Sequence, residues 1–80
     1  MNTTATMVHI FIQINRDKQE KVEFDHANVT GREIKEKAGV PLTDDLALRL
    51  GEKLEQIAND QPITIKNGEH FVALPPGTIS

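Results

Sequence analysis

Histidine is the first residue type to consider as a possible metal ligand or catalytic group in this chain. The 80-residue sequence contains three, His9, His26 and His70, and no cysteine. Protein zinc sites combine histidine, cysteine and carboxylate ligands at short, recurrent spacings. The three histidines have no such spacing, so we expect no metal site and no cofactor. Without cysteine there is also no disulfide, no thiolate ligand and no cysteine nucleophile.

Carboxylates are the other candidates for chemistry. Four of them fall in one part of the chain, at Asp44, Asp45, Glu52 and Glu55. General acid–base catalysis needs such groups held together in a pocket, and no pocket can be argued from the sequence of so small a domain. We interpret them as solvated surface. Because no nucleophile and base are arranged together, we expect the chain to have no enzymatic activity of its own.

Charge and composition narrow the classes of partner. The formal net charge is −3 with basic and acidic residues intermixed, and there are three Phe but no Tyr or Trp. This gives neither a basic stripe for phosphates nor a platform on which bases stack, so we expect no nucleic-acid binding. No apolar run approaches the roughly 18 residues of a membrane span, and residues 1–7 lack the pattern of a signal peptide. We expect a cytoplasmic protein.

The elements that would position these residues follow from hydrophobic periodicity. Residues 8–14 alternate, with Val8, Ile10, Ile12 and Ile14 on one face, and residues 21–25 alternate around Val22 and Phe24. Turn-forming residues lie between the two runs, which predicts a β-hairpin. Further strands are expected at residues 46–50, 63–65 and 70–74, with a helix as the main alternative for residues 46–50. Residues 53–58 are expected to form a helical turn or irregular chain.

One helix is expected to begin after Thr30. Thr30 with Glu33 three residues later forms the pattern of a capping box, and Ile34 and Ala38 then fall on one face. Gly39 can take the left-handed conformation that ends a helix. The element order predicts an α+β domain at residues 8–74, with a mixed sheet of four to five strands and one helix packed across it, between a flexible lead at 1–7 and an extended tail at 75–80.

Three stretches carry a resemblance to a known family. They read VHIFI at residues 8–12, VTGREIKEKAGVP at residues 29–41 and IKNGEHFVALPPG at residues 65–77. In these stretches the sequence resembles the bacterial multiubiquitin family of ubiquitin-like domains. The resemblance runs from about residue 8 to residue 77, which is nearly the whole chain. The resemblance implies a β-grasp fold, a topology that pairs the first and last strands in the centre of the sheet.

The resemblance also implies partners and a reactive end. Members of the family resemble modifiers that act together with an E1-like activating enzyme, an E2-like carrier and a zinc-dependent JAB-type peptidase. Such a modifier is a substrate: the E1-like enzyme activates the carboxylate of its C-terminal glycine with ATP, and that carboxylate is finally attached to a target protein. Gly77 is the glycine that matches, and Pro75 and Pro76 would hold the arm before it extended. A glycine suits this role because a side chain beside the reacting carboxylate would obstruct a narrow enzyme channel.

Two departures from the pattern keep alternatives open. The related modifiers end in paired glycines, whereas Gly77 is single and is followed by Thr78, Ile79 and Ser80. Conjugation would therefore require cleavage of the Gly77–Thr78 bond, a step that the JAB-type peptidase could perform. The family often carries tandem copies, so the last three residues could instead be the stub of a linker. A sulfur carrier is a third reading, against which the missing glycine argues.

The solvent-facing side of the sheet is a second candidate site. In the last predicted strand, Phe71 and Ala73 alternate with His70 and Val72, so one of the two pairs must face away from the helix. Because ubiquitin-like proteins use the exposed face of the sheet as a partner surface, the resemblance favours His70 and Val72 as the outward pair. Phe11 would lie beside them, and His9 would become a neighbour of His70 if the first and last strands pair. This face is predicted either to bind partners non-covalently or to be ordinary solvated surface.

Overall fold

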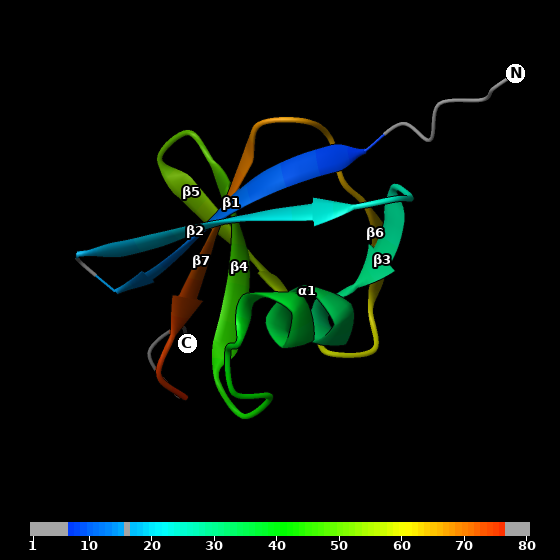
Figure 1. The fold of residues 1–80 in the computed structure, drawn as a ribbon. Helices are drawn as coiled ribbons and strands as arrows, with labels where there is room; N and C mark the ends of the chain where they lie inside the picture. The colour runs from blue at the N-terminus through cyan, green and yellow to red at the C-terminus, as the bar shows by residue number, and fades with distance from the viewer. Residues whose placement is uncertain (1–6, 16, 77–80) are drawn as a thin grey trace, which may run out of the picture.

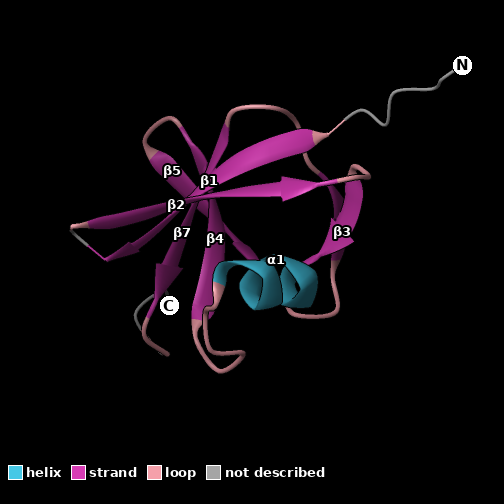
Figure 2. Cartoon of the chain, viewed as in Figure 1, coloured by secondary structure: helices cyan, strands magenta, loops and turns pink. Residues whose placement is uncertain are grey.

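The described part of the chain, residues 7–15 and 17–76 of a computed structural model, has α+β architecture (Figures 1 and 2). One α-helix packs across one face of a five-stranded mixed sheet. The elements in chain order are β1 (Val8–Asn15), β2 (Lys18–Phe24), β3 (Asn28–Thr30), α1 (Gly31–Ala38), β4 (Asp45–Leu50), β5 (Lys53–Ile57), β6 (Pro62–Thr64) and β7 (Glu69–Leu74).

The first and last strands lie side by side in the middle of the sheet. The strand order is β2-β1-β7-β4-β5, and β1 and β7 run parallel while every other neighbouring pair is antiparallel. The register places Phe11 of β1 opposite His70 of β7. The predicted central pairing is confirmed, and it gives β7 a neighbouring strand on each side, β1 along residues 69–72 and β4 along residues 71–74.

The core lies between the sheet and α1. Alternation along the strands sends every second side chain inward. Ile10 and Ile12 of β1 have no exposed surface, and Val22 and Phe24 of β2 are buried with them, as the hairpin pattern predicts. The other buried apolar residues of this core are Val29, Ile34, Val40, Leu46, Ile57, Ile65, Phe71 and Ala73.

Both ends of α1 follow from local sequence. The Thr30 side chain accepts a hydrogen bond from the Glu33 N–H, and the Glu33 carboxylate accepts one from the Thr30 N–H, so the predicted capping box is complete. Gly39 ends the helix with a φ of 76°, a conformation that costs glycine no steric penalty. The helix thereby presents Ile34 to the sheet, and of its charged side chains only Lys35 is buried while the others face solvent.

Three expectations from the sequence need correction. Residues 53–57 form strand β5, neither a helical turn nor irregular chain, because the turn at Gly51 folds them back onto β4. The short strand β6 pairs with β3 in a separate two-stranded sheet, and β3 was not expected at all. Leu50 does not join the inward leucines of β4, since it lies at the end of the hairpin with 49% of its surface exposed.

Candidate functional site

The C-terminal segment leaves the sheet from its centre. Strand β7 is held between β1 and β4 and ends at Leu74, whose register partner is Asp45. Pro75 and Pro76 follow and are exposed. Proline cannot donate a backbone hydrogen bond, so the ladder stops where they begin. Gly77 and the Gly77–Thr78 bond lie outside the described residues, as do most of the expected lead and the rest of the tail.

The predicted orientation of β7 is confirmed. Phe71 and Ala73 are buried in the core, whereas His70 is exposed and Val72 is half-buried on the opposite face. Across the sheet, Val72 lies opposite Ala47 of β4. The outer face therefore carries apolar surface along the same strand that leads into the tail.

Three rings form a row on this outer face, which we call the aromatic row: His9, Phe11 and His70. Phe11 stacks on His70 with ring centroids 5.2 Å apart, and the His9 and Phe11 rings are T-shaped with centroids 5.7 Å apart. The two histidines thus share Phe11 as a neighbour, because the β1–β7 register sets Phe11 opposite His70. Phe11 is half-buried, so it is less exposed than the sequence suggested. The row offers stacking surface beside groups that can hydrogen-bond.

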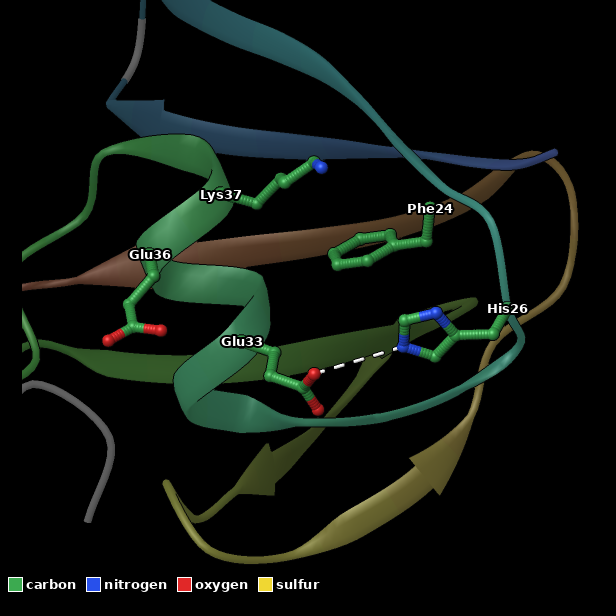
Figure 3. Close-up of a pocket in the computed structure, with 5 residues that line it drawn as sticks. All are labelled: Phe24, His26, Glu33, Glu36 and Lys37. Carbon is green, nitrogen blue, oxygen red and sulfur yellow. Dashed lines mark ion pairs between the residues drawn. The ribbon is translucent and has the colours of Figure 1, made fainter.

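A second feature, an open pocket of about 300 Å³, lies between α1 and the end of β2 (Figure 3). Its lining is Phe24, His26, Glu33, Glu36 and Lys37. The Lys37 ammonium lies 5.7 Å from the centroid of the Phe24 ring, and His26 Nε2 lies 3.8 Å from a Glu33 carboxylate oxygen. Glu33 is already engaged in the capping box. These side chains supply charge and ring surface, and none of them pairs a nucleophile with a base.

Asp25 forms a hydrogen bond with its neighbour His26 in the loop between β2 and β3. The His26 Nδ1 lies 2.5 Å from the Asp25 carboxylate. This hydrogen bond, together with the charge of the imidazole when it is protonated, holds the pKa of Asp25 below its usual value. Both side chains are exposed, so solvent screens the interaction. We assign this pair a local role in shaping the loop between β2 and β3.

The remaining candidate residues do not converge. Asp45 begins β4, whereas Glu52 occupies the turn beyond the far end of that strand, so the four carboxylates at residues 44–55 are spread along the hairpin. Within residues 7–15 and 17–76, no group of three or more His, Asp or Glu side chains is arranged to hold a metal ion. In the same residues, no helix has the length and apolar character required to cross a membrane.

Sequence reasoning missed one buried polar cluster. Lys35 is 4% exposed, and its ammonium donates to the Asn59 side-chain oxygen at 2.6 Å, to the Leu42 carbonyl at 3.3 Å and to the Asp44 carbonyl. The Asn59 amide also donates to the Leu42 carbonyl. Nothing in the local pattern marks Lys35, because its acceptors come from two separate loops, α1–β4 and β5–β6, that meet only in the folded chain.

A scan against models of known protein families gives no match to this sequence, and no curated protein matches it significantly.

Proposed function

We propose that the protein is a ubiquitin-like modifier with a β-grasp fold, conjugated to a target through the carboxylate of Gly77. The observation that carries the proposal is the place of β7, a central strand that leads directly into the exposed Pro75 and Pro76. The strand order, with its parallel central pair and one helix across one face, is compatible with a β-grasp. The resemblance of residues 65–77 to the tail of multiubiquitin domains supports the assignment of Gly77 as the reactive residue.

The chemistry proposed for the tail has four steps. A JAB-type metallopeptidase hydrolyses the Gly77–Thr78 amide and so frees the Gly77 carboxylate. That carboxylate attacks the α-phosphorus of ATP on an E1-like enzyme, which forms the acyl-adenylate and releases pyrophosphate. A nucleophilic side chain of the E1-like or E2-like protein displaces AMP to give an ester or thioester. A nucleophile of the target then takes the acyl group and releases the carrier.

The contribution of this chain is binding and positioning. A rigid sheet fixes where the arm begins, because Leu74 is the last residue of a strand that has neighbours on both sides. Two consecutive prolines favour an extended arm, which lowers the entropy lost when the arm enters an enzyme cleft. In this proposal the chain is a substrate and has no catalytic residue.

Intact-mass spectrometry tests the proposal. The chain is incubated with ATP and with the JAB-type, E1-like and E2-like proteins of the organism that encodes it. We expect loss of the mass of Thr78, Ile79 and Ser80, followed by an ATP-dependent adduct, and we expect Gly77→Glu to abolish the adduct. Ile79→Ala is the matched control, because its change lies in the part removed. An intact C-terminus without any adduct, or conjugation that persists in Gly77→Glu, would refute the proposal. A thiocarboxylate on the trimmed chain would identify a sulfur carrier instead.

The aromatic row supports a second candidate function, a non-covalent interaction module. The supporting observation is the stack of Phe11 on the exposed His70, next to the half-buried Val72. This function predicts that a chain truncated after Leu74 still binds its partner, whereas Phe11→Ser with His70→Ser weakens binding at least tenfold. Affinity measured by calorimetry for these variants separates the two candidates. Partner binding that is lost on truncation and unaffected by the serine changes would exclude the interaction module.

A further inference from the structure

Among the described residues, strand β5 has no partner on its outer side and forms one edge of the five-stranded sheet. Of its five residues only Ile57 is buried, and the other four are exposed. Leu54, in its interior, has 45% of its surface exposed, which makes it one of the few large apolar side chains left in solvent among the described residues. An edge strand presents unpaired backbone groups that can template pairing with another strand.

The hairpin that joins β4 to β5 determines which backbone groups are free. Leu50 is the register partner of Lys53, and two residues, Gly51 and Glu52, connect them. Gly51 has a φ of 64°, as the first position of a type II′ turn requires. In a two-residue hairpin the flanking pair exchanges both hydrogen bonds, and the pattern then alternates. The N–H and C=O groups of Leu54 and Gln56 therefore face the open edge.

We propose that β5 pairs antiparallel with β5 of a second copy of this chain, about a two-fold axis through Leu54. In this register the Leu54 groups of the two copies exchange both backbone hydrogen bonds, and Gln56 of each copy pairs with Glu52 of the other. The two Leu54 side chains then lie directly opposite on the outer face. Leu54 is the cross-strand partner of Arg49, which lies two residues after Ala47 and so on the same side of β4, the side that Ala47 shares with its register partner Val72. The result is one continuous sheet across the dimer.

Charge complementarity favours a second copy of this chain as the partner at the open edge of β5. In the Leu54-centred register, Lys53 of each copy faces Glu55 of the other, which gives two cross-strand ion pairs. Lys53 and Glu55 are exposed, and neither has an ion pair within residues 7–15 and 17–76. Shifting the axis to Glu55 would place like charges opposite one another, which is destabilising, and would centre the dimer on backbone groups already bonded to β4.

The opposite edge of the sheet, strand β2, lacks an exposed apolar residue. Strand β2 has its apolar side chains Val22 and Phe24 buried in the core, so its exposed residues are polar. A lysine on an edge strand usually discourages pairing, and Lys21 fits that role. The difference between the edges is the residue that lies between the lysine and the glutamate: Leu54 of β5 is exposed, whereas Val22, between Lys21 and Glu23 of β2, is buried. The structure therefore distinguishes one edge as a dimer interface.

A contact of this length buries less than the roughly 1,200 Å² of a stable interface, so the dimer should be weak, with a dissociation constant on the order of 10⁻⁴ M. Sedimentation equilibrium with interference optics measures it, because the chain has no Trp or Tyr to absorb at 280 nm. In a dilution series followed by amide NMR, we expect concentration-dependent shifts at residues 52–56.

Charge exchange makes the test specific. Lys53→Glu and Glu55→Lys should each weaken dimerisation at least tenfold by opposing like charges, and the double variant should restore it, since the pairs re-form with reversed sign. Lys21→Glu, the same change on the opposite edge, is the matched control and should leave dimerisation unchanged. A monomer at all concentrations up to about 1 mM, a double variant that stays weak, or a dimer disrupted by Lys21→Glu would each overturn the proposal.

Discussion

Replacing Gly31 with alanine should lower the free energy of unfolding by about 2–3 kcal/mol, the usual cost of forcing an extra methyl into a packed site. A Cβ at this position would lie 2.3 Å from the Ala58 carbonyl oxygen and 3.0 Å from its carbonyl carbon. Both atoms belong to the backbone, so no flexible side chain can turn away. The first turn of α1 would have to move off the loop that follows β5.

That movement would also strain a backbone hydrogen bond. The Arg32 N–H donates to the Asn59 carbonyl at 2.9 Å and fastens the start of α1 to the same loop. Helix propensity alone predicts the opposite sign, since alanine is favoured over glycine in a helix interior by about 1 kcal/mol. Urea denaturation followed by far-UV circular dichroism gives the sign directly. Arg32→Ala, at the exposed neighbouring residue, serves as a control with little expected effect, and a stabilised Gly31→Ala would disprove the close approach.

Lys35→Met should also destabilise the fold, by about 2–3 kcal/mol, because it leaves oxygen acceptors of the α1–β4 and β5–β6 loops without their donor. Methionine keeps much of the volume of lysine, so packing is largely preserved. What is lost is an ammonium whose donors reach the Leu42 and Asp44 carbonyls and the Asn59 side chain. Removing a buried positive charge offsets part of this cost, which keeps the expected effect below the full loss of three charged hydrogen bonds.

The matched control is Lys37→Met on the same helix. Lys37 is exposed, and its ammonium lies over the Phe24 ring at a distance typical of a weak cation–π contact, worth about 0.5–1 kcal/mol. Chemical denaturation of both variants should therefore rank Lys35→Met well below Lys37→Met in stability. Equal stabilities would mean that the Lys35 ammonium does not hold the two loops together.

Much of the fold could be predicted because its signals are local. The alternation in residues 8–14 and 21–25 specified the first hairpin, and the buried Ile10, Ile12, Val22 and Phe24 confirm it. The ends of α1 rest on contacts within a few residues, so Thr30, Glu33 and Gly39 marked them reliably. Period-2 alternation separated His70 and Val72 from Phe71 and Ala73, and the outward choice of the first pair, which rested on the resemblance, is confirmed by the buried Phe71.

The features that were missed depend on partners distant in sequence. Residues 53–57 have Leu54 and Ile57 three apart, a helix-like spacing, yet they form β5 because β4 satisfies their backbone hydrogen bonds. Strand β3 exists only through its pairing with β6, more than 30 residues later. The Lys35 cluster likewise requires α1 to meet two separate loops.

The sequence by itself determined that residues 8–14, 21–24, 46–50 and 70–74 lie in strands, where the helix starts and stops, and that a single glycine follows two prolines near the C-terminus. Only the tertiary structure decided that Phe11 stacks on His70, that Gly31 must lack a side chain, and that β5 is left as an open edge with Leu54 exposed. The reason is physical. Local patterns encode hydrogen bonds and burial along one element, whereas register and close approach arise only when elements far apart in the chain pack together.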